Sequence, residues 1–403
     1  MAVKGTPSWL GDENARTALS LLLENGPLSR NRISALSGLS KPTAAQMVSR
    51  LSERGLIKVV GAESAGRGRN GAVYAIRDDL LYGVAISIDQ EGVRSRIVDP
   101  LGTDFPVATK VVSQMQANRS AARDVAEAVL AACDEAGIDL GLVQHVCVGV
   151  PSSVDSRRDE LSSVEALPGW SRTKIRSQLE EALGCEVVID NDVNLAAVAE
   201  RSVSDFDPVS TVAVFWIGYG IGLALDIAGT VHRGSSGGAG EIGHLPVSRG
   251  MLNPDAESTD IEDIIGAAAL DRICRELGEM YAFEDVLAGK EVPRRVLESL
   301  APRLALAVIP VLSVLDPGVV VLGGPVGRAS GGQLAELTRT AIRNHTRWDP
   351  DIQITRVAGD PVVAGAAAVS MERLRGLLAD RATTPYEDDE RTKTIARSLR
   401  TIS

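Results

Sequence analysis

The sequence predicts an α/β body that follows a small basic helical module. From Leu80 onward, short β-branched runs alternate with Ala- and Leu-rich helical patterns, which is typical of α/β folds. Residues 1–78 hold eleven Lys and Arg against six Asp and Glu, a net charge of +5 in a chain of −11, which leaves −16 for the remainder. We therefore predict a basic module over residues 10–78, a body over 79–378 and a poorly ordered polar tail over 379–403.

The basic module has the element order of a winged helix-turn-helix. Residues 14–25 carry an apolar helical face, and a short second helix is predicted over 30–38. A third helix over 41–55 follows a tight turn, with Ser40 as its N-cap. Two strand-like runs within residues 55–76, joined by a segment rich in Gly and Arg, complete the pattern as a β-hairpin wing.

The outward face of the third helix carries small and hydrogen-bonding side chains, which suit a DNA major groove. The wing arginines could reach phosphates or an adjacent minor groove. The predicted DNA contacts are Ser40, Lys41, Thr43, Ala45, Gln46, Ser49 and Arg50 around the third helix, and Arg67 and Arg69 in the wing. The alternative is a small helical bundle whose charges only solvate its surface, and a DNA affinity that did not respond to salt would favour it.

Composition excludes several other classes of protein. A content of 44% hydrophobic and 24% charged residues is that of a globular chain. The apolar run at residues 304–315 is shorter than a membrane span, and residues 1–14 lack a secretion signal, so we expect a cytoplasmic protein that does not cross a membrane. The four cysteines are widely spaced, which predicts reduced thiols. Thirteen aromatic residues are few for stacking single-stranded nucleic acid or lining a lectin groove.

Several segments of the body together resemble the ROK family of sugar kinases and repressors. RGSSGGAGEIGH (Arg233–His244) is similar to the family signature RGAxGxAGEIGH, and VVIDNDVNLAAVAE (Val187–Glu200) is similar to the catalytic segment. GVPSSVD, LPGW and VLGGPV are similar to further family elements, and a winged helix-turn-helix before the body is the arrangement of the repressor branch. The resemblance implies an actin-like fold of two α/β lobes that close over a cleft, usually in a homodimer or homotetramer.

The resemblance also implies a sugar site. In family kinases an Asp activates a sugar hydroxyl, and Asp192 occupies that position. The carboxylate could act as a general base or only accept a hydrogen bond, with Asn191 as both donor and acceptor. The implied sugar-binding residues are Asn191, Asp192, Glu241, His244 and Glu262. The alternative for Asp190 and Asp192 is turn and helix-cap chemistry at the end of a strand, and His244 alone could be an ordinary hydrogen-bonded histidine.

The nucleotide side departs from the family pattern. The phosphate motif DxGGTK aligns without gaps with Ser87–Gly92, where Ser replaces the Asp and both glycines are absent. Phosphate cradles need small residues and positive surroundings, whereas Asp89 and Glu91 bring negative charge. The glycines of IGYGIG (217–222) are compatible with a tight hairpin turn. We therefore predict no ATP cofactor, no phosphoryl transfer and no enzyme activity.

The family's zinc cluster is also missing. Family members often follow the His of GEIGH with CxCGxxGC, whereas residues 245–263 here contain no cysteine. A structural zinc site needs about four ligands, and only His244 remains of the family set. We predict no bound metal, and stoichiometric zinc in an elemental analysis would refute that prediction.

Together these features predict a sequence-specific transcriptional regulator, in the first place a repressor. Its expected partners are duplex operator DNA and a sugar or sugar derivative, and two modules in a homodimer would favour a pseudo-palindromic site. One alternative is a sugar kinase with an appended DNA-binding module, and another is a regulator that no longer senses a sugar. The identity of the sugar, the operator and regulated genes, the direction of the response and the choice between dimer and tetramer are left open by the sequence.

Overall fold

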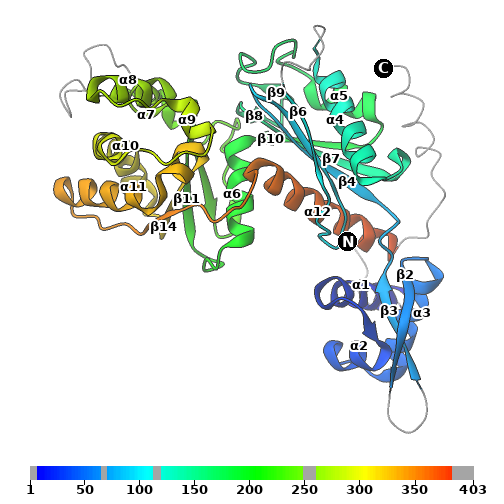
Figure 1. The fold of residues 1–403 in the computed structure, drawn as a ribbon. Coiled ribbons are helices and arrows are strands. Elements are labelled where there is room, and N and C mark those ends of the chain that lie inside the picture. Colours follow the sequence, from blue (N-terminus) through cyan, green and yellow to red (C-terminus); the bar gives the residue numbers. More distant parts are fainter. Residues whose placement is uncertain (1–6, 65–69, 112–118, 248–259, 384–403) are drawn as a thin grey trace.

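The computed structural model describes residues 7–64, 70–111, 119–247 and 260–383. Figure 1 shows a small N-terminal module at one end of the molecule and two α/β lobes beyond it. Each lobe is built on a five-stranded sheet with helices on both faces. The predicted fold class, a winged helical module followed by a two-lobed α/β body, is confirmed.

The module consists of three helices and a three-stranded sheet. The helices are α1 (Pro7–Asn25), α2 (Arg30–Ser37) and α3 (Lys41–Glu53), and the strands are β1 (Leu28–Ser29), β2 (Ile57–Ser64) and β3 (Asn70–Ile76), in the order β1-β3-β2. As predicted, the side chain of Ser40 caps α3 by accepting a hydrogen bond from the amide of Thr43. The buried residues of α3 are Ala44, Met47, Val48 and Leu51, which lie on one face of the helix.

Two features of the module differ from the sequence prediction. α1 begins at Pro7 rather than at residue 14, and it passes Gly11 at a point where the guanidinium of Arg50 packs against the helix. β1 has only two residues, and Leu28 pairs with Tyr74 of β3, a pairing too short to leave a pattern in the sequence. The wing tip, residues 65–69, lies outside the described residues together with the predicted contacts Arg67 and Arg69.

The N-terminal lobe has a sheet in the order β10-β7-β4-β5-β6. Its strands are β4 (Tyr82–Ile88), β5 (Gly92–Val98), β6 (Val107–Val111), β7 (Val143–Val150) and β10 (Glu186–Asn191), with η2 (Leu140–Leu142) and the small hairpin of β8 (Val154–Asp155) and β9 (Glu160–Leu161) beside them. Strands β10, β7 and β4 are parallel, whereas β5 and β6 are antiparallel. Helices α4 (Ala121–Ala136) and α5 (Ile175–Leu183) cover one face, and α12 (Pro361–Arg381) covers the other.

The C-terminal lobe has a second sheet in the order β13-β12-β11-β14-β15. Its strands are β11 (Thr211–Ile217), β12 (Ile221–Ile227), β13 (Thr230–Val231), β14 (Val319–Gly323) and β15 (Ile352–Ile354). Helix α6 (Asp192–Val203) packs on the face that Val212 and Val214 share, and Phe215 belongs to the core on the opposite face. The helices that follow are α7 (Glu262–Ile265), α8 (Ala267–Leu277), α9 (Phe283–Leu287), α10 (Arg294–Leu315) and α11 (Gly324–His345), with η3 (Ile242–His244) preceding them.

Among the described residues, α10 alone is long and apolar enough to cross a bilayer by length and composition. It has 22 residues, more than the apolar run visible in the sequence, because residues 294–303 extend the same helix. Of its most apolar stretch 56% is buried, and Leu304 and Val308 lie in the core of the C-terminal lobe. This burial is that of a core helix.

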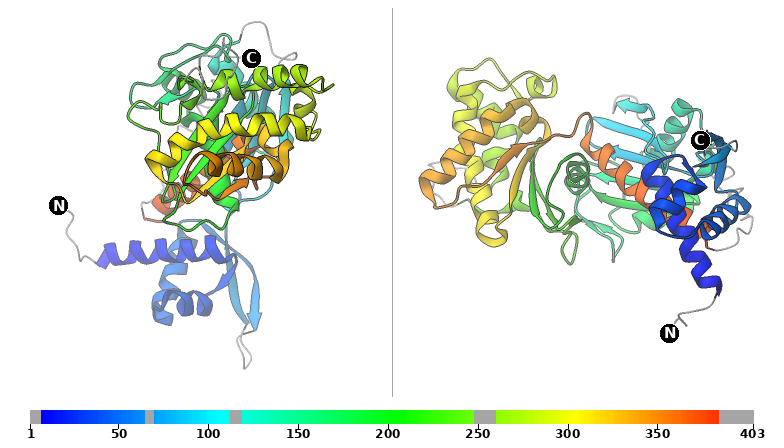
Figure 2. Two further views of the ribbon diagram at one scale, coloured as in Figure 1. Left: turned by 90° about the vertical axis from the view of Figure 1, so that its left-hand side faces the viewer. Right: turned by 90° about the horizontal axis from the view of Figure 1, so that it is seen from below.

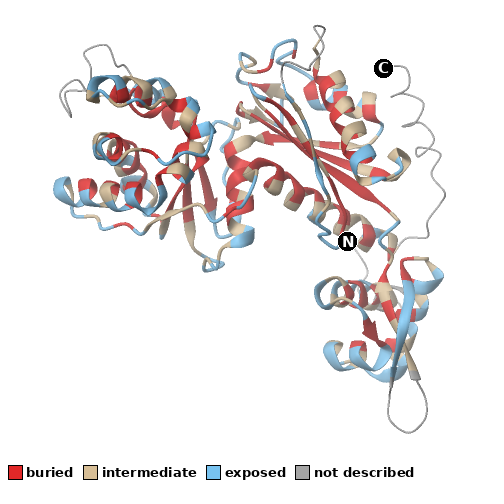
Figure 3. Cartoon of the chain, in the orientation of Figure 1, coloured by how far each residue is buried: buried red, intermediate tan, exposed pale blue. Residues whose placement is uncertain are grey.

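The last helix joins the body to the module. α12 runs through residues 379–381 and Ala382 is fully buried, so the predicted tail begins too early. The reason is that Leu374, Leu378 and Ala382 extend the apolar face of α12 into one buried cluster with the core of the module. Figure 3 shows buried residues along α12. Residues 384–403 lie outside the described part of the chain. Figure 2 shows the module projecting from the N-terminal lobe.

Candidate functional site

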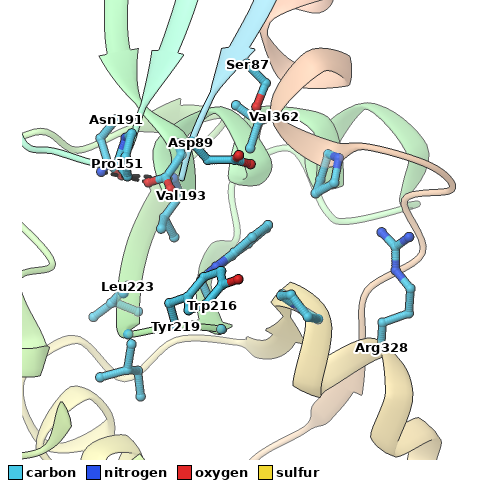
Figure 4. A pocket seen from close by; sticks show the side chains of 18 of the residues that line it. Ser87, Asp89, Pro151, Asn191, Val193, Trp216, Tyr219, Leu223, Arg328 and Val362 are labelled. Atoms are coloured by element: carbon cyan, nitrogen blue, oxygen red, sulfur yellow. Dashed lines mark hydrogen bonds between the residues drawn. The ribbon is translucent and has the colours of Figure 1, made fainter. Parts of the chain in front are cut away.

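A cleft of about 1000 Å³ lies between the two lobes. Its walls come from the β4–β5 turn, the β10–α6 junction, the β11–β12 turn, residues 237–244 and the first half of α11. In Figure 4, Asp89 and Asn191 lie on the side of the N-terminal lobe, Trp216 and Tyr219 lie opposite them, and Arg328 projects from α11. Of the predicted sugar-binding residues, the cleft brings together Asn191, Asp192, Glu241 and His244.

Asn191 and Asp192 stand where β10 ends and α6 begins. Asn191 is the N-cap of α6, because its Oδ1 accepts hydrogen bonds from the amides of Val193 at 2.9 Å and Asn194 at 3.2 Å. Its Nδ2 donates to Asp192 Oδ1 at 2.9 Å and to the carbonyl of Ser152 at 3.3 Å. The helix-cap interpretation therefore applies to Asn191, whose side-chain oxygen and nitrogen both have hydrogen-bond partners within the protein.

Asp192 combines burial with negative neighbours. Burial raises the pKa of its carboxyl group to about 7, and the nearby carboxylates of Asp89 and Glu241 add to that rise, whereas the amide of Val193 opposes it. A carboxyl group that titrates near neutral pH is partly ionised there, and its ionised form can act as a general base or accept a hydrogen bond from a hydroxyl. Both roles that the sequence left open for Asp192 are chemically available.

Asp190 has a different role from Asp192. Its side chain is buried, and Arg233 donates to it from Nε at 3.1 Å and from Nη2 at 2.5 Å. The backbone amide of Asn191 and the side-chain amide of Asn194 also donate to Asp190 Oδ1. The ion pair of Asp190 with Arg233 thus joins the end of β10 to the first residue of the segment Arg233–His244. Sequence reasoning did not pair these residues, since 43 positions separate them.

Glu241 and His244 lie in an exposed turn around η3 and line the cleft. Glu262 begins α7 and is not among the cleft-lining residues that the structure describes. Its carboxylate lies beside the β11–β12 turn, so close that a β-carbon added at Gly220 would be 2.9 Å from Glu262 Oε2. Burial raises the pKa of Glu262, and the neighbouring His244 opposes that rise. Glu262 therefore contacts the turn beneath the site, and its role as a sugar ligand stays a prediction.

The β4–β5 turn, where the phosphate motif would lie, is filled by its own side chains. Asp89 Oδ1 accepts hydrogen bonds from the amides of Glu91 at 2.8 Å and Gly92 at 3.1 Å. Arg94 joins the other oxygen of Asp89 to Asp360, the N-cap of α12. Across the cleft, the hydroxyl of Tyr219 donates to Glu91 at 3.2 Å. Two backbone amides of this turn thus already donate to the carboxylate of Asp89.

No group of three or more His, Cys, Asp or Glu side chains is arranged to hold a metal within the part of the chain that the structure describes. The segment that replaces the family's zinc cluster, residues 248–259, lies outside that part. The absence of zinc therefore stays a prediction.

The candidate DNA surface is the outer face of α3. Ser40, Lys41, Gln46 and Ser49 are exposed and Thr43 and Ala45 are half-buried, as a helix laid on a groove requires. Ser40 and Thr43 share a hydrogen bond of 2.8 Å between their hydroxyl groups, and Ser49 bonds to Glu53. The contacts of these residues with DNA stay a prediction.

Arg50 lies where α3 meets α1. It is half-buried, as Thr43 and Ala45 are, and its Nη1 pairs with Asp12 of α1 at 3.2 Å, so its contact with DNA stays a prediction. The partner is 38 residues upstream, in a turn of α1 that the sequence analysis did not assign to a helix. Two other basic residues, Arg30 and Arg32, are exposed at the start of α2 and were not singled out. The guanidinium of Arg30 lies 5.3 Å from the ring centre of Tyr74.

A winged helix-turn-helix module attached to a two-lobed body with a polar cleft defines a class of DNA-binding regulators that carry a ligand-binding type of body. A model of the ROK family matches residues 108–372, and a winged helix-turn-helix DNA-binding model matches residues 12–58. The chain therefore belongs to the ROK family, and its module places it among the transcriptional regulators of that family.

Individual relatives agree with this assignment. A putative xylose repressor of Caldicellulosiruptor sp. (strain Rt8B.4) is 22% identical over 390 residues, which cover 88% of this chain and 94% of the relative. The crystal structure of a ROK family transcriptional regulator, a homolog of the E. coli MLC protein, superimposes with a TM-score of 0.68 at 19% identity and covers 93% of this chain and 99% of that one. The crystal structure of a ROK hexokinase from Thermus thermophilus superimposes with a TM-score of 0.58 at 24% identity, and the match covers 73% of this chain and 100% of that one. The two structures show a shared fold.

Proposed function

We propose that this regulator binds a sugar between its lobes and thereby changes its affinity for operator DNA, acting as a repressor without kinase activity. The observation that carries the proposal is the chemistry of the residues that line the cleft. Asp192, Glu241 and His244 present oxygen and nitrogen atoms that suit sugar hydroxyls. The neighbouring β4–β5 turn, where a phosphate would have to bind, has its amides occupied by Asp89 and its charge negative.

The β4–β5 turn disfavours the nucleotide binding that phosphoryl transfer requires. A nucleotide phosphate would need free amides and a positive surrounding. Here Asp89 occupies the amides of Glu91 and Gly92, and the charge of Arg94 is matched by Asp89 and Asp360. A triphosphate would have to displace this network and approach three carboxylates, which disfavours binding.

The relatives suggest the first sugar to test. Those that span most of this chain are named xylose repressors, so D-xylose is the first probe, followed by D-glucose and N-acetylated and phosphorylated hexoses. A regulator that acts on chromosomal DNA would work in the cytoplasm. We expect a homodimer or homotetramer, which light scattering of the purified protein would measure.

The deciding experiment is a fluorescence-anisotropy titration against duplex DNA from the region upstream of the gene. It is run at two salt concentrations, with and without each sugar. We expect specific binding that weakens as salt rises and that one sugar alters. Salt-sensitive binding that no sugar alters would support a regulator without a sugar response, and the absence of DNA binding would contradict the proposal.

A second candidate function is a sugar kinase with an appended DNA-binding module. The observation that favours it is Asp192, which keeps the kinase position and has a pKa of about 7, a suitable value for a general base. Sugar-dependent ATP turnover by the purified chain, abolished in Asp192→Ala, would establish this function. We expect no turnover above that of the variant.

A further inference from the structure

We propose that α12 transmits the state of the cleft to the DNA-binding module. This inference rests on the proposed function, because it supplies the route by which a ligand between the lobes would change DNA affinity. One end of the helix lies in the cleft, its first half is packed directly against α6, and its last turn contacts the module. At 1.5 Å per residue its 21 residues span about 30 Å.

The first turn of α12 is part of the cleft wall. Asp360, Pro361 and Val362 line the cavity, and Asp360 caps the helix by accepting hydrogen bonds from the amides of Val362 at 2.8 Å and Val363 at 3.0 Å. The second oxygen of Asp360 accepts a hydrogen bond from Nε of Arg94, and Nη2 of Arg94 donates to Asp89. Any ligand or lobe movement that shifts Asp89 or Arg94 therefore acts directly on the helix cap.

The first half of α12 is packed on α6, the helix that begins at Asp192. Gly365 lies so close to α6 that a β-carbon there would overlap the carbonyl oxygen of Leu195. Val362 and Leu195 also press against the backbone of Gly149 at the end of β7. Because the contact at Gly365 joins backbone to backbone, side-chain rotation cannot absorb a displacement. A pull on Asp192 consequently reaches α12 as a movement of the whole helix.

The last turns of α12 lie beside the module. Leu374, Leu378 and Ala382 are fully buried and belong to the same apolar cluster as Leu19 and Leu22 of α1. Around this contact, Arg16 of α1 lies 3.7 Å from Asp380 and bonds to the hydroxyl of Thr383 at 3.5 Å. An exposed ion pair of this kind contributes little, so we place the coupling in the buried cluster to which both elements belong.

The direct test is amide hydrogen exchange of the full chain, with neither DNA nor sugar present. Arg94→Leu removes the link to Asp360 but leaves the helix cap itself in place. We expect amides in the first turn of α12 and amides of α1 over residues 16–25 to exchange at least threefold faster. Lys110→Ala is the matched control, since it removes an ion pair with Glu127 on the opposite face of the same sheet. This control should leave both segments unchanged.

A second background shows whether the effect travels through the helix. In Leu378→Ala, Arg94→Leu should still speed exchange in the first turn of α12 but should no longer add to exchange in α1. The proposal is overturned if α1 does not respond to Arg94→Leu, if it responds equally to Lys110→Ala, or if its response survives in Leu378→Ala. If Arg94→Leu does not fold, Asp360→Asn replaces it with the same expected results. Failure to find a sugar or an operator would contradict the proposed function alone, because this measurement needs neither.

Discussion

Among single residues, Asp192 most clearly links structure to a measurable pH dependence. Its pKa in the folded chain is about 7, against an ordinary value of about 3.9 for an unfolded chain. Between about pH 4 and pH 7 the unfolded chain has released this proton while the folded chain keeps it, so the free energy of unfolding falls as pH rises through that window.

Asp192→Asn should remove this pH-dependent loss of stability, because an amide does not titrate. The new amide oxygen can still accept hydrogen bonds from Asn191 and Val193. We expect the variant to gain stability over the parent as pH rises, by at most about 1.4 kcal/mol for each pH unit between 5 and 7. Urea unfolding of both proteins at pH 5, 6, 7 and 8 measures the difference. A difference that stays constant with pH would show that Asp192 ionises normally in the folded chain.

The pair of Asp190 and Arg233 should show an asymmetric response to substitution. Arg233→Met leaves a buried carboxylate without its cation, which costs about 3 kcal/mol, whereas Asp190→Asn leaves an arginine side chain that is 41% exposed and can turn to water. We expect the second variant to lose about 1 kcal/mol. Denaturant midpoints of the two variants measure this order. Equal losses would mean that the pair acts only through its hydrogen bonds.

Residue identities were predictable from the sequence where a local pattern or a family motif determined them. Asn191, Asp192, Glu241 and His244 were placed by resemblance, and the structure brings all four to one cleft. The bond of Asp190 to Arg233 and that of Arg50 to Asp12 were not predictable, because each joins residues that only the tertiary fold places together. A helical period shows which side of α3 is polar, but it does not show that Arg50 pairs with a carboxylate of a neighbouring helix.

At the scale of elements, α3 should separate base recognition from phosphate attraction. Gln46 is exposed and can bond to the edge of an adenine, so Gln46→Ala should cost about 1–3 kcal/mol on the specific site and relax one base position. Lys41→Ala should weaken binding to all sequences and lower the salt slope by about 1. Anisotropy on specific and scrambled duplexes distinguishes the two effects. Lys290→Ala in the distant lobe is the charge control, and the same loss there would contradict the assignment of this surface.

The packing of α12 on α6 predicts opposite effects for two glycines of the same helix. Gly365→Ala would force a β-carbon into the Leu195 carbonyl and should cost about 3 kcal/mol. Gly376→Ala meets no atom closer than 3.8 Å and should add about 0.5–1 kcal/mol through better helix propensity. Thermal unfolding of both variants checks the signs. A neutral Gly365→Ala would mean that the two helices can separate at little cost.

Element boundaries were predictable where caps and apolar periods coincide, and not elsewhere. The third helix was predicted to begin after Ser40, and α3 does begin at Lys41, because a capping serine precedes it there. The end of α12 at Arg381 depends on the buried cluster that this helix shares with the module. The early turns of α1 contact α3 through the ion pairs of Asp12 with Arg50 and Arg54, which the sequence alone does not show.

At the scale of the whole molecule, the module shares its core with the N-terminal lobe. One buried cluster contains Leu19 and Met47 of the module together with Val98 of the sheet and Leu374 and Leu378 of α12, whereas the core around Phe215 belongs to the C-terminal lobe. A unit that shares a core unfolds as one cooperative block. The module should therefore melt with the N-terminal lobe and not as an independent domain.

Scanning calorimetry of the full chain tests this expectation. Leu378→Ala deletes buried methyl groups within the shared cluster and should cost about 2–5 kcal/mol. The transition that includes the module should then move down by several degrees, while the transition of the C-terminal lobe stays in place. Leu304→Ala, in the core of α10, is the matched control and should move the other transition instead. A separate early transition for the module, unmoved by Leu378→Ala, would show that the module is only tethered, and α12 could not then carry a signal to it.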